Sequence, residues 1–297
     1  MSAEPSGGWA SAGAPAHPPM SPQVPRVFAG LVDDAAVFPP GNAPLPEAIE
    51  GHRAHRVAWY SELVGPLLVP ASSLGDLATL LDHGERLTIG VIGDTGLDGL
   101  KASQPTDGIE IRQVEVAVAK RGEDPLPGLR TMLTQLADRP GVLGYAEVPL
   151  TWGLLSALDA LAEARAGGAP IAPKFRTGGL ASELFPTPVE LAAVVCACRD
   201  RRLPFKLTAG LHHAIRYTDQ ETGFVHHGFL NVLAASVVAA DGGEVHDVAE
   251  LLGATDAVPL IETARRKLTQ DRPLWIGFGT CSIAEPLAVL EQLGLLR

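Results

Sequence analysis

Two cations lie inside apolar segments that have the pattern of buried strands. Lys174 stands in IAPKFRTGG at residues 171–179, and Lys206 stands in PFKLTAGLHH at residues 204–213. Lysine and arginine are among the side chains least often buried, so their presence in such segments needs a chemical explanation. Because successive strand residues point to opposite faces, Lys174 and Arg176 share one face, and we expect that face to line an interior site.

Two neighbouring lysines suit covalent chemistry on a carbonyl group. A lysine ammonium becomes a nucleophile only after it loses a proton, and a second cation together with desolvation lowers the pKa of the amine. The free amine can then attack a carbonyl and form a Schiff base, which acts as an electron sink for a neighbouring carbon–carbon bond. We therefore expect one of the two lysines, Lys174 or Lys206, to have a pKa lowered toward neutrality by the other.

Two carboxylates could move protons during this chemistry. In the segment at 109–119, alternating valines occupy one face and leave Glu115 on the other. In the segment at 142–148, Glu147 shares a face with Tyr145. A carboxylate beside the lysines can shuttle protons while the carbinolamine loses water. The predicted catalytic residues are Lys174, Lys206, Glu115 and Glu147.

The elements that must position these residues alternate between strands and helices. Eight apolar segments, each followed by a helical pattern, predict a parallel sheet with right-handed crossovers. They lie at residues 27–32, 65–70, 87–93, 109–119, 142–148, 171–175, 204–209 and 274–279. Eight such units are typical of an α/β protein with the (β/α)8 or TIM barrel, whose active sites form at the carboxyl ends of the strands. The longer stretch at 210–273 predicts a helical insertion between strands seven and eight, with helices at 225–240 and 257–268.

An open doubly wound sheet is the alternative architecture. It is disfavoured because no G-x-G-x-x-G follows the first strand and no G-x-x-x-x-G-K-[ST] occurs in the chain. Residues 1–25 are rich in Pro, Ala, Gly and Ser and predict a disordered tail, followed by a single barrel domain at 26–297.

Composition and charge narrow the classes of function. The chain has 297 residues, 46% of them hydrophobic, and a formal charge of −11. A negative net charge disfavours nucleic-acid and membrane partners, because both need a positive surface. Three cysteines, and no apolar run long enough to span a bilayer, predict a cytoplasmic protein. A small-molecule substrate is the expected partner, and a homo-oligomer is left open.

The strand motifs resemble those of a known enzyme family. Class I deoxyribose-phosphate aldolases are (β/α)8 barrels with E-V-D-V-V on strand four, K-T-S-T-G on strand six, F-K-x-x-G-G on strand seven and F-G-x-S-S on strand eight. Here QVEVAV presents Glu115, KFRTGG begins at Lys174, FKLTAG contains Lys206 and FGTCS runs over 278–282. The resemblance implies that Lys174 is the Schiff-base nucleophile, that Lys206 lowers its pKa and that Glu115 shuttles protons.

The loops after the strands supply the predicted substrate-binding residues. The resemblance implies that the regions of Gly210 and 279–282 hold a phosphate. Arg176 stands where the family has a small residue, and we expect it to fill space or to bind an anion. Asp33 and Asp34 follow the first predicted strand at the mouth of the barrel. The predicted substrate-binding residues are Arg176, Thr177, Gly178, Gly179, Gly210, His212, His213, Gly279, Thr280, Ser282, Asp33 and Asp34.

These observations favour a lyase similar to the aldolases, which forms a Schiff base with a small anionic carbonyl substrate and uses no cofactor or metal. Two other functions stay open. The histidine pairs at 212–213 and 226–227 could, with Asp33 or Asp34, form the metal site of a lyase or isomerase. A barrel that binds a small anion without turnover would use the cations only as ligands. A purely structural network of ion pairs is a further interpretation of the buried charges.

Overall fold

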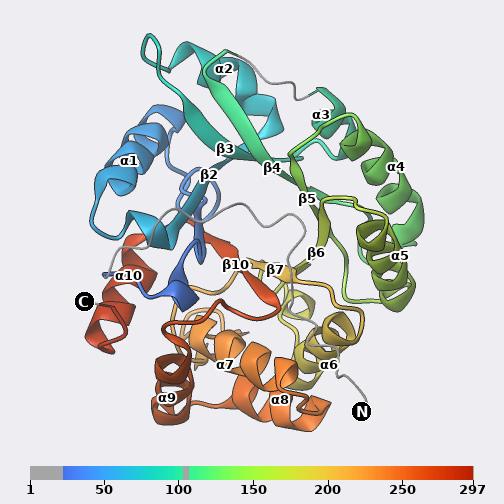
Figure 1. Ribbon diagram of the computed structural model, residues 1–297, viewed down its shortest axis with the longest axis vertical. Coiled ribbons are helices and arrows are strands. Elements are labelled where there is room, and N and C mark those ends of the chain that lie inside the picture. Colours follow the sequence, from blue (N-terminus) through green and yellow to red (C-terminus); the bar gives the residue numbers. More distant parts are fainter. Residues whose placement is uncertain (1–22, 103–106, 297) are drawn as a thin grey trace, which may run out of the picture.

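Eight parallel strands close into a barrel in this computed structural model, which describes residues 23–102 and 107–296 (Figure 1). The barrel strands are β1 (Val32–Asp34), β2 (Val64–Pro70), β3 (Leu87–Ile92), β4 (Ile109–Ala117), β5 (Leu143–Glu147), β6 (Ile171–Arg176), β7 (Phe205–Thr208) and β10 (Trp275–Thr280). Their order around the barrel is β1-β10-β7-β6-β5-β4-β3-β2. The prediction of a (β/α)8 barrel is confirmed.

Helices surround the strands and connect them (Figure 1). They are α1 (Leu45–Val57), α2 (Leu74–Thr79), α3 (Leu97–Ala102), α4 (Pro125–Ala137), α5 (Leu154–Ala166), α6 (Pro188–Asp200), α7 (Phe229–Ala240), α8 (Val245–Gly253), α9 (Ala257–Lys267) and α10 (Ala284–Gln292). Local sequence sets where several begin: Asp124 caps α4, and Thr187 and Glu190 form a capping box at α6. Among the described residues, no helix combines the length and apolarity needed to cross a membrane.

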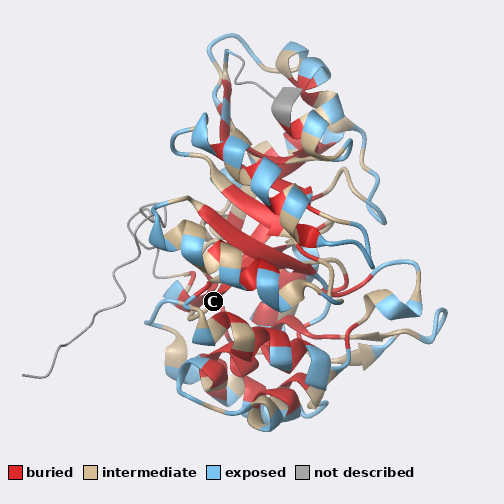
Figure 2. Ribbon diagram, turned by 90° about the vertical axis from the view of Figure 1, so that its right-hand side faces the viewer, coloured by how far each residue is buried: buried red, intermediate tan, exposed pale blue. Residues whose placement is uncertain are grey.

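The buried residues lie along the strands and on the inner sides of the helices (Figure 2). On β4 this burial follows the alternation of the strand. Val114 and Val116 belong to the apolar core, whereas Gln113 and Glu115 point into the lumen and contact polar groups from other strands. The predicted parity of this strand is therefore confirmed.

The insertion between β7 and β10 holds one more helix than predicted. Helices were expected at 225–240 and 257–268, and the structure adds α8 between them. The reason is local, because Glu244 and Asp247 form a capping box that starts a new helix. α7 and α8 pack together and cover the lower part of the barrel in Figure 1.

A two-stranded antiparallel hairpin precedes α7. It consists of β8 (Tyr217–Thr218) and β9 (Val225–His226), and it extends away from the barrel at the lower right of Figure 2. α7 therefore begins at Phe229 rather than at the predicted residue 225, because the residues before it pair with a strand.

The first strand begins later than predicted. The segment expected at 27–32 contains a 3-10 helix at Arg26–Phe28, and the strand covers Val32–Asp34. Strand pairing decides this boundary, because Asp33 lies beside Gly279 of β10 in the closed barrel. Both predicted aspartates consequently lie on the strand and not in the loop after it.

The chain already packs into the core just before the predicted domain boundary at residue 26. Val24, two residues before it, is fully buried in the core. Residues 1–22 of the predicted tail lie outside the described residues.

Candidate active site

The two predicted lysines meet inside the barrel. In the strand register Lys174 of β6 lies beside Lys206 of β7, and Glu147 of β5 lies beside Lys174. The lysines are buried, with 4% and 2% of their surface exposed. Both point inward because their neighbours of opposite parity, Phe175 and Phe205, are fully buried and contact each other.

One carboxylate joins the two lysines. Glu115 accepts a hydrogen bond from Lys174 Nζ at 2.8 Å through Oε2, and it contacts Lys206 Nζ through Oε1. Only 1% of Glu115 is exposed. The structure therefore brings together the three residues to which the resemblance gives catalytic roles.

A second carboxylate, that of Asp33 on β1, contacts Lys206 Nζ. Gln113 Nε2 donates to Asp33 Oδ2 at 2.7 Å and to Glu115 Oε1 at 2.9 Å. Gly65 of β2 leaves the space for this carboxylate, since a Cβ there would lie 1.9 Å from Asp33 Oδ1. The amide and the lysine thus hold both carboxylates in place.

A third carboxylate connects the site to the barrel mouth. Glu147 contacts Lys174 Nζ at 3.0 Å through Oε2 and accepts from Arg176 Nε at 3.1 Å through Oε1. Its side chain is 17% exposed, more than that of Glu115 or Lys174. Glu147 is therefore the member of the cluster with the most access to solvent among these three.

The neighbouring carboxylates affect the pKa of each lysine more strongly than the other lysine does. Burial lowers the pKa of Lys174, but attraction to Glu115 and Glu147 more than compensates, so the pKa is raised. The pKa of Lys206 is raised in the same way by Asp33 and Glu115. Lys206 does act to lower the pKa of Lys174, but this effect is smaller. The expected direction of the Lys174 pKa shift, toward neutrality, is thus wrong.

Two of the carboxyl groups differ in their affinity for protons. Burial favours the neutral form of Glu115, but attraction from Lys174 and Lys206 outweighs it and lowers the pKa of Glu115 to about 2. The pKa of Asp33 is raised by burial, against the attraction of Lys206 and with repulsion from Glu115. Neighbouring carboxyl groups with pKa values pushed apart can take different roles in proton transfer.

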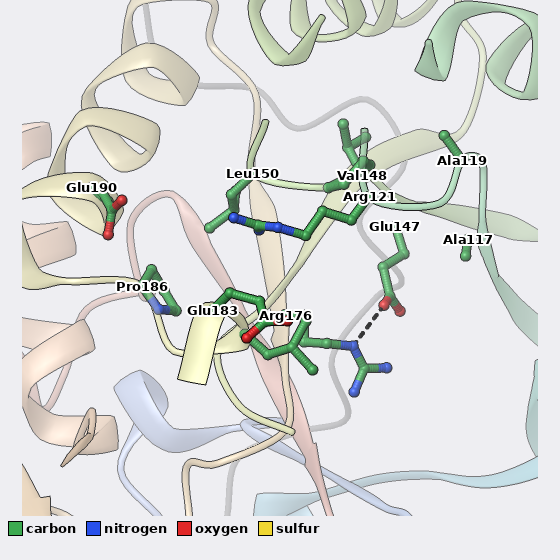
Figure 3. A pocket seen from close by; sticks show the side chains of 12 residues that line it. Ala117, Ala119, Arg121, Glu147, Val148, Leu150, Arg176, Glu183, Pro186 and Glu190 are labelled. Carbon is green, nitrogen blue, oxygen red and sulfur yellow. Dashed lines mark hydrogen bonds and ion pairs between the residues drawn. The ribbon is translucent and has the colours of Figure 1, made fainter. Parts of the chain in front are cut away.

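A cavity of about 180 Å³ opens where β4, β5 and β6 end (Figure 3). Glu147 lines it and also contacts Lys174, so this lysine lies next to the cavity. The other charged residues of its wall are Arg121, Arg176, Glu183 and Glu190.

The turns after β6 and β7 pack closely against each other. Thr177 is buried, and its Oγ1 donates to the carbonyl of Ala209 at 2.6 Å. A Cβ on Gly178 would lie 3.1 Å from the Cα of Gly210, which has φ +85°. Gly179 packs in the same way against Leu184. These predicted binding residues lie together at the strand ends, where they make structural contacts.

The predicted binding residues of β10 lie on another side of the mouth. Gly279 lies beside Leu68, to which a Cβ would come within 3.1 Å. Thr280 is buried, and its Oγ1 accepts from Ser282 N at 3.4 Å. Ser282 Oγ accepts from Glu285 N at 3.4 Å and so helps to begin α10.

Asp34 points away from the lysines. It follows Asp33 on β1 and therefore occupies the opposite face. Asp34 Oδ2 lies 3.0 Å from Nδ1 of His52 on α1, and both side chains are buried. The structure thus brings Asp33 into the site and leaves Asp34 between the strand and its helix.

The predicted histidines have other neighbours. His212 Nδ1 lies 3.1 Å from Glu285 Oε2, and the ring of His213 packs edge-on against Tyr217 at 4.2 Å. His227 Nε2 lies 2.8 Å from a backbone carbonyl. Within residues 23–102 and 107–296, no group of three or more His, Cys, Asp or Glu side chains is arranged to hold a metal ion.

Three residues around the site were missed by the sequence reasoning. Gln113 and Tyr145 each precede a predicted carboxylate by two positions, so the alternation already placed them on the lumen face. The Nζ of the β7 lysine lies 4.6 Å from the centre of the Tyr145 ring, within reach of a cation–π contact. Arg121 follows β4 in a turn, where no periodicity marks it.

Comparison with known proteins finds no matching family model, no matching curated protein and no matching solved structure. The fold and the site therefore define a class: a (β/α)8 barrel with buried lysines and carboxylates toward the carboxyl ends of its strands. This end carries the active sites of enzymes with the fold. The fold is commonly enzymatic, but the reaction must be argued from the side chains.

Proposed function

We propose that the protein is a lyase that forms a Schiff base between Lys174 and a small anionic carbonyl substrate. The observation that carries the proposal is the carboxylate of Glu115, which contacts both lysines. Two lysines and a shared carboxylate supply a nucleophile, a second cation and a proton carrier. The resemblance of the strand motifs to class I deoxyribose-phosphate aldolases supports the same chemistry.

Lys174 is better placed than Lys206 to be the nucleophile. It contacts Glu147, which lines the cavity. Lys206 instead contacts the carboxylates of Asp33 and Glu115, which are both buried. Lys174 is therefore the lysine that contacts a residue of the cavity wall.

The proposed reaction begins with the fraction of Lys174 that has lost its proton to solvent, because the pKa of Lys174 is raised and that of Glu147 is lowered. The amine nitrogen then bonds to the carbonyl carbon, and the carbonyl oxygen takes up a proton to give a carbinolamine. Loss of water leaves a protonated imine. The imine accepts the electron pair of the neighbouring carbon–carbon bond as that bond breaks and becomes an enamine, while the hydroxyl group on the departing carbon loses its proton to the ionised Glu115 and becomes a carbonyl. Protonation of the enamine and attack of water on the resulting imine then release the second product and free Lys174.

Binding of a small anion without turnover is the second candidate. The raised pKa values of Lys174 and Lys206 keep both side chains charged at neutral pH, which suits an anion ligand. The two candidates differ in one respect, because only the lyase forms a covalent bond to the substrate.

Trapping with borohydride tests the covalent step. The protein is incubated with a small aldehyde, sodium borohydride is added, and the digested peptides are analysed by mass spectrometry. We expect the Lys174 peptide to gain the mass of the reduced adduct, because hydride reduces the imine to a stable amine. Lys174→Met should lose this adduct while the protein remains folded by circular dichroism.

Lys120 serves as an internal control in the same digest, because it is exposed on the surface. Labelling of Lys174 well above that of Lys120 would support the lyase. Equal labelling of the two residues would refute the proposed lyase and favour the anion-binding barrel.

A further inference from the structure

Arg176 presents an unoccupied hydrogen-bonding edge to the cavity beside Lys174. Its Nε donates to Glu147, and its two terminal nitrogens donate to no residue in the described part of the chain. In Figure 3 these nitrogens lie on the side of the guanidinium away from the Glu147 carboxylate. The side chain is 43% exposed, so a ligand can reach it.

The other carboxylates of the cavity leave this edge free. Glu183 and Glu190 also line the wall, but among the described residues neither forms an ion pair with Arg176. Arg121 lies in the same wall, and its charge acts on Glu190, whose pKa it helps to lower. The terminal nitrogens of Arg176 are therefore donors from which no described carboxylate accepts, although the chain as a whole carries a formal charge of −11.

Glu147 sets the distance between this edge and the nucleophile. One of its oxygens contacts Lys174 Nζ at 3.0 Å, and the other contacts Arg176 Nε at 3.1 Å. Because a single carboxylate spans the two cations, Nζ and Nε lie no more than about 8 Å apart, and the terminal nitrogens lie on the order of 2 Å beyond Nε. A ligand that touches both must be short.

We propose that the free edge of Arg176 binds the anionic group of the substrate while Lys174 attacks its carbonyl carbon. This inference rests on the Schiff-base function proposed above and adds the residue that binds the acid group of the substrate and the distance of that group from the carbonyl. The guanidinium fork matches the two oxygens of a carboxylate or phosphate. The substrate is thus a small carbonyl compound whose acid group lies on the order of three to five atoms from the carbonyl, as the short span between the two cations requires.

In this proposal the substrate anion binds to Arg176 at the end of β6, and not to the turns that contain Gly178 and Gly210. The turns at Gly178 and Gly210 are occupied with close backbone contacts to each other. A guanidinium two residues after the nucleophile supplies charge and direction that a glycine turn lacks. Arg176 accordingly sets specificity for the acid group, and it acts on substrate binding.

Matched pairs of aldehydes test this assignment by the same borohydride trapping. Succinic semialdehyde is compared with butanal, a neutral aldehyde of equal chain length, and glyceraldehyde 3-phosphate is compared with glyceraldehyde. We expect half-maximal labelling of Lys174 at an about 10- to 100-fold lower concentration of the anionic member of at least one pair, as the loss of a charge-assisted contact predicts. The pair that shows the preference identifies carboxylate or phosphate.

Substitution of Arg176 should remove the preference but not the labelling. In Arg176→Gln the anionic and neutral aldehydes should label Lys174 at similar concentrations. Arg121→Gln is the matched control, because it removes a different cation from the same wall. In Figure 3 the side chain of Arg121 extends toward Leu150. This variant should keep the preference within about twofold, since an exposed charge at a distance is screened.

The outcomes separate the two proposals. Absence of Lys174 labelling by every aldehyde would refute the Schiff-base function and the inference with it. Labelling of Lys174 with an unchanged preference in Arg176→Gln would overturn the inference alone. Equal loss of preference in Arg176→Gln and Arg121→Gln would also overturn it, because a general positive field would then explain the selectivity.

Discussion

At the scale of single residues, the site consists of charges that would each be costly if buried alone. Glu115 and Lys206 are almost inaccessible to solvent, and each contacts more than one opposite charge. Removing one partner of such a pair typically costs about 3–5 kcal/mol, because the other charge stays buried. The carboxylates that stabilise the lysines also raise their pKa values and so favour the ammonium forms.

The pH dependence of imine formation follows from this charge state. Lys174 reacts only as the free amine, and its pKa is raised, so the rate of trapping should increase with pH through the neutral and alkaline range. Glu147 contributes to the raised pKa. In Glu147→Gln the increase should therefore occur at lower pH, because the neutral amide no longer favours the ammonium form.

This prediction is measured as the initial rate of Lys174 labelling between pH 6 and about 10, at a fixed concentration of a neutral aldehyde. Glu183→Gln removes a carboxylate from the same cavity that makes no ion pair with Lys174, and its profile should match that of the wild type. A profile for Glu147→Gln that is unchanged, or displaced to higher pH, would contradict the role given to Glu147.

At the scale of elements, each strand supplies only one or two side chains to the site, and the neighbouring strands must leave room for them. β1 covers three residues, yet it supplies Asp33 to the lumen. β2 accommodates this carboxylate only because Gly65 has no side chain there. The position of Asp33 therefore depends on the residue of a different strand.

A methyl group at this position should displace the carboxylate. Gly65→Ala is expected to lower the free energy of unfolding by about 1–3 kcal/mol, as overpacking of a buried site does. Gly51→Ala in α1 is the control, because a Cβ there meets no atom within 4 Å. It should raise the free energy of unfolding by about 0.5–1 kcal/mol, as alanine replaces glycine inside a helix. Urea unfolding measures both, and equal stability of the two variants would contradict this account of β2.

At the scale of the whole molecule, closure of the barrel joins the two ends of the domain. β1 pairs with β10, the first barrel strand with the last. Arg272, just before β10, stabilises this junction of β1 and β10, which we call the seam. Its guanidinium donates to the carbonyl of Trp275 at 2.9 Å and also to the carbonyls of Val27 and Ile276.

Loss of this arginine should weaken the whole fold without changing the chemistry. Arg272→Met leaves several buried carbonyls without their charged donor, and we expect a loss of about 2–4 kcal/mol in the free energy of unfolding. Labelling of Lys174 in the folded variant should stay at the wild-type level. Arg26→Gln breaks an exposed ion pair with Asp271 near the same seam and should leave the melting temperature unchanged. A stable Arg272→Met would show that the seam does not need the guanidinium.

Much of the architecture was predictable because it depends on local pattern. The alternation of apolar segments and helices indicated the barrel, and the two-residue period of β4 and β6 turned Glu115 and Lys174 toward the lumen. The additional helix α8 and the late start of β1 were not predicted, because a capping box and strand pairing decide them.

The sequence alone therefore determined the fold class and which face of β4, β6 and β7 carries the charged groups, since strand geometry makes every second residue point the same way. Only the tertiary structure decided which charges meet. Closure of the barrel brings Asp33 to Lys206, 173 residues away, and leaves Asp34 outside. It also surrounds the lysines with carboxylates, which reverses the expected direction of their pKa shifts, because electrostatic attraction depends on distances in space and not on spacing along the chain.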